Sequence, residues 1–140
     1  MTLTKNSHKI DIRIYYEDTD AGGVVYHANY LNFGERARCE LLRDIGHECS
    51  KLEDEFGSIF VVKHIDIEYN RPAMLDDALE VITTIEKLKN TSFLAKHLIQ
   101  KQGETICEMH VTLVCVDTNT IRPVSLPYIL RTELKKLLEE

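Results

Sequence analysis

The sequence lacks any apolar run long enough to cross a membrane. No stretch approaches the roughly 18 consecutive apolar residues of a transmembrane helix. The first residues, Met1 to Lys9, also lack the apolar segment of a secretory signal peptide. We therefore expect a leaderless, cytoplasmic protein without a transmembrane segment.

Metal-type cysteine spacing is also missing. The 4 cysteines, at positions 39, 49, 107 and 115, form no CxxC pair and no zinc-finger pattern. Without a secretory signal they indicate buried free thiols and not a disulfide framework, and we expect no metal or redox role for them.

Excess positive charge is absent. Lys and Arg number 17 against 23 Asp and Glu, which gives a net charge of -6. Such a balance disfavours nucleic acid and anionic membrane surfaces as partners. Any anionic ligand must therefore meet a local basic cluster.

Internal repeats, low-complexity tracts and linkers are lacking as well. A chain of 140 residues, 44% hydrophobic and 29% charged, fits one folded domain over residues 1–140 and excludes disorder as its main state.

Hydrophobic periodicity predicts an α+β protein. Alternation over His8 to Tyr16 indicates a half-buried strand, with Tyr16 on the core side. Steps of three and four residues from Asn29 to Ile45 indicate a long helix, which Asn29 can cap and Gly46 can end. Further strands are expected around Phe60–Tyr69, 79–85, 93–99 and 107–115, a short helical turn over Glu48–Glu55, and a last helix over Tyr128–Leu138 after Pro127. This order favours an antiparallel sheet folded over one helix.

Gly34 lies inside the predicted long helix. Glycine costs up to about 1 kcal/mol there relative to alanine. Either another element approaches the helix closely at this point, or the helix simply tolerates a poor helix former.

The polar segment from Asp18 to Tyr30 is the candidate for chemistry. It delivers two aspartates, two glycines and His27 to the start of the long helix. Free first-turn amides at that point can stabilise an oxyanion, and an ionised aspartate can act as base or nucleophile. The alternative is that Asp18 and Asp20 only cap turns and the glycines only bend the chain.

The residues from Tyr15 to Arg38 carry a specific string, D-x-D-x-x-G-x-V-x-H-x-x-Y. This stretch resembles the hotdog-fold acyl-CoA thioesterases of the 4-hydroxybenzoyl-CoA thioesterase type, and within them the YbgC-like, Tol-Pal-associated group. The likeness extends over nearly the whole chain, including 69–73 and 89–93. It implies a hotdog fold, in which an antiparallel sheet wraps a long central helix, and hydrolysis of acyl-CoA to a carboxylic acid and free CoA.

The resemblance also assigns roles to individual residues. Asp20 matches the catalytic carboxylate of the family, acting as nucleophile or as general base. The backbone N–H of His27 matches the oxyanion donor, although the imidazole could instead act as general acid. Gly23 matches the glycine that shapes the loop. Asp18 and Tyr30, within the same motif, are expected at the substrate site, with Asp18 mainly holding the loop.

Coenzyme A carries phosphates and needs local cations on an acidic protein. The candidates are basic or polar residues near strand ends: Arg71, Lys89, Asn90, Ser92 and Lys96. Solvated strand ends explain these side chains equally well. No cofactor is expected, because coenzyme A is part of the substrate.

Several further readings stay open. Asp18, Asp20 and His27 could in principle ligate a metal ion, but no second ligand motif supports this. Tyr15 or Tyr16 could shape the acyl pocket. His97 and His110 are expected to be hydrogen-bonded sheet histidines.

One sheet and one helix leave apolar faces uncovered, so we expect a homodimer or homotetramer. A non-catalytic module that binds acyl-acyl carrier protein is the alternative function.

Overall fold

The computed structural model describes residues 2–4 and 6–139, and its centre is one antiparallel sheet in the order β1-β2-β4-β5-β6-β3. The six strands are β1 (Thr2–Thr4), β2 (Ser7–Arg13), β3 (Ser58–Tyr69), β4 (Ala78–Leu88), β5 (Ser92–Lys101) and β6 (Glu104–Asp117). The helical elements are η1 (Tyr16–Asp18), α1 (Asn29–Asp44), η2 (Cys49–Lys51), α2 (Leu52–Phe56) and α3 (Tyr128–Lys135).

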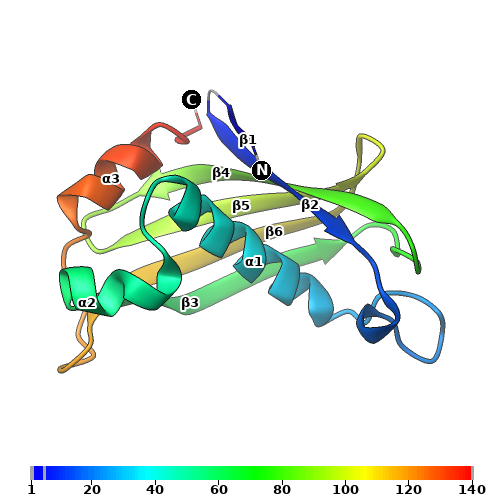
Figure 1. Ribbon diagram of the computed structural model, residues 1–140, viewed down its shortest axis with the longest axis horizontal. Helices are drawn as coiled ribbons and strands as arrows, with labels where there is room; N and C mark the ends of the chain where they lie inside the picture. The colour runs from blue at the N-terminus through cyan, green and yellow to red at the C-terminus, as the bar shows by residue number, and fades with distance from the viewer. Residues whose placement is uncertain (1, 5, 140) are drawn as a thin grey trace.

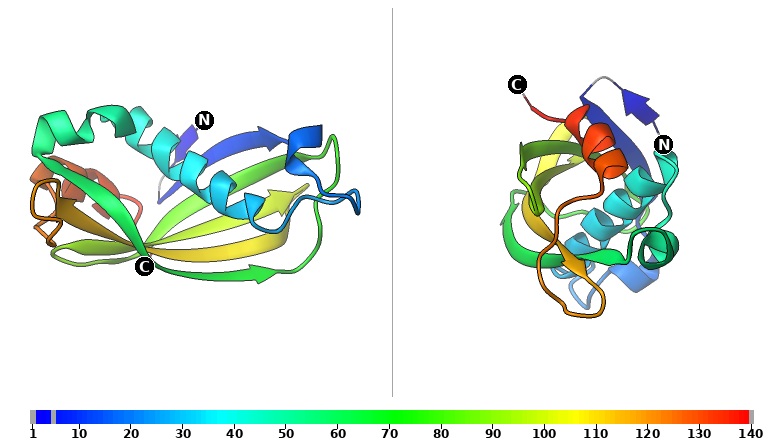
Figure 2. Two further views of the ribbon diagram at one scale, coloured as in Figure 1. Left: turned by 90° about the horizontal axis from the view of Figure 1, so that it is seen from below. Right: turned by 90° about the vertical axis from the view of Figure 1, so that its left-hand side faces the viewer.

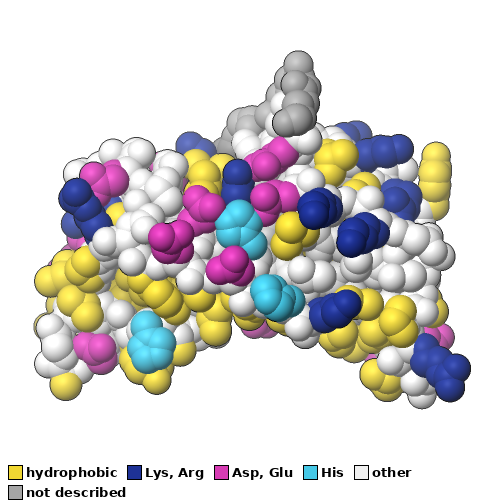
Figure 3. All heavy atoms as spheres, turned by 180° about the vertical axis from the view of Figure 1, so that it is seen from behind, with side chains coloured by type: hydrophobic (Ala, Val, Ile, Leu, Met, Phe, Trp, Pro, Cys, Tyr) yellow, Lys and Arg dark blue, Asp and Glu magenta, His cyan; other side chains and the backbone are white. Residues whose placement is uncertain are grey.

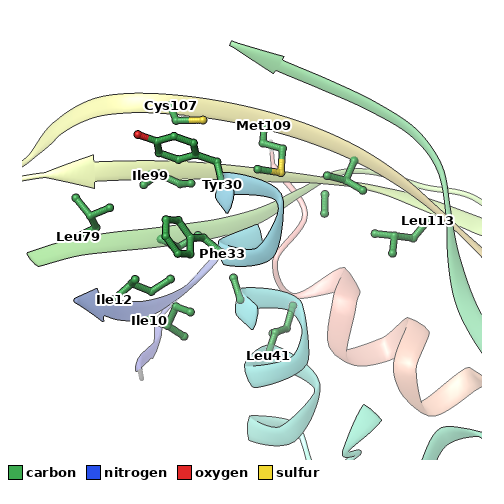
Figure 4. Close-up of a cluster of buried hydrophobic side chains, with 14 of the residues drawn as sticks. Ile10, Ile12, Tyr30, Phe33, Leu41, Leu79, Ile99, Cys107, Met109 and Leu113 are labelled. Atoms are coloured by element: carbon green, nitrogen blue, oxygen red, sulfur yellow. The ribbon is translucent and has the colours of Figure 1, made fainter. Parts of the chain in front are cut away.

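The sheet curves around α1, which crosses its concave face (Figures 1 and 2). Tyr30, Phe33, Ala37 and Leu41 lie on the buried side of the helix. They meet inward side chains of β2, β4, β5 and β6, among them Ile10, Leu79, Ile99 and Met109 (Figure 4). The predicted α+β hotdog arrangement is confirmed.

The two ends of α1 differ in how well the sequence predicted them. Gly46 has φ +96°, and the His47 and Gly46 amides donate to Leu42 and Arg43 carbonyls, so the predicted glycine ending is confirmed. The prediction that Asn29 caps the start of α1 is wrong. Ala28 occupies the cap position without a side-chain hydrogen bond, and Asn29 is already inside the helix, with its Nδ2 donating to Asp18 and its Oδ1 accepting from Asn32 Nδ2.

Gly34 is buried against the sheet. A Cβ at this position would lie 2.9 Å from Met109 Sδ and 3.3 Å from His97 Cδ2. The close approach is therefore real, and it is made by side chains of β6 and β5.

The first long strand ends earlier than the alternation suggested. β2 stops at Arg13, and the chain turns into η1 at Tyr16. Tyr16 is 80% exposed, so the prediction that it packs in the core is wrong. The last helix is also shorter than predicted and ends at Lys135.

β3 is an edge strand with an unusual surface. Its residues pair only with β6 among the described strands, and its burial pattern is exposed along most of its length. Val61, Val62, Ile65 and Tyr69 are each more than one third exposed. Figure 3 shows hydrophobic side chains gathered in the lower part of the outer face, whereas charged and histidine side chains occupy its centre. Such an edge is a template for pairing with another chain.

The cysteines divide into two pairs. Cys107 and Cys115 are buried, as predicted. Cys39 is only partly buried and Cys49 is exposed, so the prediction of buried thiols is wrong for these two. They end up at the surface because the chain turns back beside the last turns of α1.

Within the described part of the chain, no helix has both the length and the hydropathy of a membrane span.

Candidate active site

A small hairpin carries Asp20. The Asp20 N–H donates to the Val24 carbonyl over 2.9 Å, and Thr19 and Val25 form a bridge below it. Gly23 takes φ +81°, the left-handed conformation that glycine allows at low cost, so its predicted turn-shaping geometry is present. The hairpin holds Asp20 exposed at its tip.

The carboxylate of Asp20 is partly engaged. Its Oδ1 accepts a hydrogen bond from the Gly22 N–H at 2.8 Å, whereas Oδ2 has no protein donor among the described residues. The alternative that Asp20 caps a turn therefore accounts for only one of its two carboxylate oxygens. The other oxygen is available for a substrate or a water molecule.

The hairpin is tied to the segment before β4. The Val25 N–H donates to the Ala73 carbonyl at 2.9 Å, and Val24 bridges Met74. Ala73 in turn donates its N–H to Tyr30 Oη on α1. The loop, the β3–β4 connection and the helix start are thus one hydrogen-bonded unit.

Asp18 is buried and links the loop to α1. Its Oδ2 accepts from the Tyr15 N–H at 2.9 Å, and its Oδ1 accepts from Asn29 Nδ2 at 2.7 Å. Its carbonyl also accepts from the Tyr26 N–H. Both carboxylate oxygens are therefore used inside the chain, which fits the loop-holding role. A direct contact of Asp18 with substrate stays a prediction.

His27 stands immediately before the helix. Its side chain is exposed, and its carbonyl accepts a hydrogen bond from Tyr69 Oη at 2.9 Å. No hydrogen bond from its N–H is found among the described residues. A free N–H beside the positive end of the α1 dipole is the arrangement that an oxyanion needs.

Aromatic rings form the wall beyond His27. Tyr69 lies edge-on to both His27 and Tyr30, and Tyr30 packs edge-on against Phe33. Burial raises the pKa of Tyr30. It also raises the pKa of Tyr69, which is less buried. Both phenols therefore remain neutral near pH 7, and Tyr69 acts as a hydrogen-bond donor.

A cavity of about 270 Å³ lies between these rings and the end of β3. Its lining consists of Val25, His27, Tyr30, Tyr69, Asn70, Arg71 and Pro72. Arg71 is mostly exposed and pairs with Glu104 at 3.0 Å. Of the predicted phosphate ligands, Arg71 alone lines this cavity.

The remaining basic candidates lie elsewhere. Lys89, Asn90 and Ser92 surround the β4–β5 turn, at the far end of β4 from the Asp20 loop. The 11 residues of β4 span about 35 Å at roughly 3.3 Å per residue. Lys96 pairs with Glu139 within the sheet region. Within one chain, the fold does not bring these residues to Asp20.

The β4–β5 turn includes a cation that sequence reasoning missed. Arg131 of α3 donates to the carbonyls of Lys89 and Asn90. No ion pair to an acidic side chain is found for Arg131 or Lys89 within the described residues. Arg131 lies about forty residues after Lys89 and Asn90 in the sequence, so no local pattern indicated that it belongs to this turn.

A second, more apolar cavity of about 310 Å³ opens beside the C-terminal half of α1. Leu42, Leu52, Phe60, Val62 and Phe93 are part of its wall. It reaches β3, the exposed edge strand, so a partner on that edge would lie against it.

Metal binding finds no support from the loop geometry. Asp18 has both oxygens engaged, and no group of three or more His, Cys, Asp or Glu suited to a metal ion occurs among the described residues.

Comparisons with known proteins agree with one another. Residues 15–137 match the family model of the thioesterase-like superfamily. A curated acyl-CoA thioesterase YbgC of Haemophilus influenzae is 41% identical over 125 residues, covering 89% of this chain and 92% of the relative. The acyl-CoA thioester hydrolase YbgC of Escherichia coli O6:H1 is 42% identical over 126 residues, covering 89% and 93%.

A solved structure gives the same result for the fold. The probable thioesterase of Bartonella henselae superimposes with a TM-score of 0.82 at 35% identity. The match covers 86% of this chain and 99% of that one.

Proposed function

Because this chain belongs to the thioesterase-like superfamily and is an acyl-CoA thioester hydrolase, we propose that Asp20 and the His27 N–H perform the hydrolysis. The observation that carries the proposal is the pairing of one exposed carboxylate with one unbonded amide at the start of α1. A carboxylate that is ionised at neutral pH can drive attack, and the amide can receive the developing negative charge.

The reaction consumes one water molecule. As a general base, Asp20 takes a proton from water while the water oxygen bonds to the thioester carbonyl carbon. As a nucleophile, Asp20 itself bonds to that carbon and a mixed anhydride is then hydrolysed. In both routes the carbonyl oxygen becomes an oxyanion facing the His27 N–H, and the C–S bond breaks to release CoA thiolate. No cofactor takes part, because coenzyme A enters as substrate.

Tyr69 holds the backbone directly after the proposed oxyanion donor. By donating to the His27 carbonyl, its hydroxyl fixes the peptide on the C-terminal side of His27. Its ring, with those of Tyr30 and His27, walls the cavity of about 270 Å³. The thioester end of the substrate therefore meets a rigid aromatic surface.

The complete site is that of a homodimer. Two copies pairing antiparallel along β3 about its centre set Tyr69 opposite the partner subunit's Ser58. The β4–β5 turn lies at that same end, since Ser92 pairs with Val114 and Val114 with Val61. Lys89, Asn90 and Ser92, with Arg131, would then approach the catalytic loop of the partner and could bind CoA phosphates.

The same pairing would allow the apolar cavity to bind the acyl chain of the substrate. Its wall includes Phe60 and Val62 near the start of β3, so it would adjoin the partner's catalytic loop. An acyl chain leaving that loop would enter a space lined mainly by aliphatic and aromatic groups. We expect the protein to act in the cytoplasm on acyl-CoA.

The experiment is steady-state hydrolysis of a panel of acyl-CoAs, with a thiol reagent reporting free CoA. Turnover of at least one short, long or aromatic acyl-CoA supports the proposal. Binding of acyl-acyl carrier protein without release of thiol from any acyl-CoA would instead favour the non-catalytic alternative.

A further inference from the structure

Two of the four cysteines meet at the rim of the apolar cavity. Cys39 lies near the end of α1 and Cys49 begins η2, yet the Cys49 thiol donates to Cys39 Sγ across only 2.9 Å. That separation is within about 1 Å of the ~2.05 Å bond of a disulfide. Cys49 is exposed and Cys39 partly so, which gives small reagents access to both.

Charged side chains flank the pair of sulfurs. The guanidinium groups of Arg38 and Arg43 lie near both sulfurs, and the carboxylate of Glu35 acts on Cys49. Partial burial and the hydrogen bond to Cys39 raise the pKa of Cys49 to about 12. Cys49 therefore keeps its proton near pH 7 and is the hydrogen-bond donor of the pair.

The other two cysteines are different. Cys107 is fully buried, and burial raises its pKa to about 12; burial also raises the pKa of Cys115. Neither has a neighbouring thiol among the described contacts. They serve as internal controls for reactivity.

We propose that Cys39 and Cys49 form a dithiol site that hydroperoxides oxidise to an intrachain disulfide. The Cys39 sulfur gives up its proton and attacks one peroxide oxygen, the O–O bond breaks, and a sulfenic acid forms on Cys39 while the departing hydroxide takes up that proton and leaves as water. Cys49 then attacks that sulfur, the S–O bond breaks, and a second water leaves with the proton of Cys49. Two thiols are oxidised by two electrons, and hydrogen peroxide is reduced to two water molecules.

The bond would fasten η2 to α1. Leu52 follows η2 directly and forms part of the cavity wall. Oxidation therefore fixes one side of the cavity to the helix. The site is independent of the proposed catalytic residues, which lie at the other end of α1.

Tryptic mapping tests the proposal directly, because cleavage after Arg38, Arg43 and Lys51 separates the two cysteines onto peptides 39–43 and 44–51. Cys107 and Cys115 stay together on a third peptide. The purified full chain is treated with a small excess of hydrogen peroxide, quenched by alkylation under denaturing conditions and digested. Cys49→Ser is the test variant and Cys115→Ala the matched control.

The expected product is the linked 39–43/44–51 pair, with alkylatable thiols falling from four to two and returning with dithiothreitol. The control forms it too, and Cys49→Ser does not. Four unchanged thiols, sulfinic or sulfonic acid on Cys49 beside a free Cys39, or a cross-link between two chains would each overturn the proposal. The readout does not depend on hydrolysis, so it stands or fails separately from the proposed function.

Discussion

At the scale of single residues, Asp18 explains why the catalytic loop has one conformation. Replacing it with asparagine keeps the shape but turns one of its two accepting oxygens into a donor, which then faces either the Tyr15 N–H or Asn29 Nδ2. An unsatisfied buried polar contact costs about 1–3 kcal/mol. We expect Asp18→Asn to lose that much free energy of unfolding in urea, with a smaller loss of kcat than Asp20→Asn. Unchanged stability would remove Asp18 from the loop-holding role.

Substitution of His27 distinguishes the role of its backbone N–H from that of its imidazole. His27→Ala keeps the N–H at the helix start, so we expect about a 10-fold loss of kcat through changes in the aromatic wall. An imidazole acting as general acid on the leaving thiolate would instead cost ~10² to 10⁴ and remove the near-neutral limb of the pH–rate profile. The second outcome would transfer the role from the amide to the ring.

His97 makes stability depend on pH. Burial and the Arg38 guanidinium lower its pKa to about 3, so it stays neutral, accepts from Arg38 and bonds Thr83. An unfolded chain protonates its histidines near pH 6.5. Between about pH 6.5 and 3 the unfolded state thus binds more protons, and stability falls as pH falls.

The measurement is denaturant unfolding of the wild type and His97→Gln at pH 7 and pH 5. From pH 7 to 5 the wild type should lose about 2 kcal/mol more than the variant. Parallel losses in the two proteins would contradict the buried neutral histidine.

At the scale of elements, the contact between α1 and the sheet is set at Gly34. A methyl group there would meet Met109 Sδ at 2.9 Å, and the flexible methionine can move aside. We expect Gly34→Ala to change the free energy of unfolding by less than about 1 kcal/mol, since helix propensity partly compensates. Gly34→Leu should lose about 1–3 kcal/mol or fail to fold. A fully stable leucine variant, measured by urea unfolding, would show that the approach is not tight.

Local patterns predicted most elements. The three- and four-residue spacing located α1 within one residue at its end, and alternation located the long strands of the sheet. Gly46 worked as a signal because only a left-handed residue completes that helix ending. Asn29 does not cap the helix, because its side-chain oxygen, the atom that a cap uses as acceptor, accepts from Asn32 Nδ2 and its nitrogen donates to the distant Asp18.

Other features depended on contacts that no local pattern contains. Tyr16 continued the alternation of β2, but the chain leaves the sheet at Arg13 for η1. The Cys39–Cys49 contact requires the turn after α1 to fold back. Arg131 reaches the β4–β5 turn only because α3 packs beside it. The motif around Asp20 was found from its resemblance to a family, whereas spacing alone left turn-capping open.

At the scale of the whole molecule, the exposed edge of β3 is the proposed dimer interface. Val62 is 47% exposed on this strand. A charge buried between two strands is costly, so we expect Val62→Glu to convert a particle of at least twice 16.2 kDa to a monomer. Its hydrolysis should fall at least ~10-fold, because each site would lose its partner. Size-exclusion chromatography with light scattering gives the mass.

Ile129→Glu is the matched control, since Ile129 is 55% exposed but belongs to α3 and not to the edge strand β3. It should remain dimeric and active. An active monomeric wild type at micromolar concentration would contradict the shared site.

The central claim is that Asp20 hydrolyses the thioester. The most direct measurement is kcat for CoA release by Asp20→Asn beside the wild type, with Asp11→Asn as control because Asp11 is an exposed aspartate on β2. We predict a loss of at least ~10²-fold for Asp20→Asn, an unchanged fold by circular dichroism and near-wild-type turnover for Asp11→Asn. Near-wild-type turnover by Asp20→Asn would contradict the account.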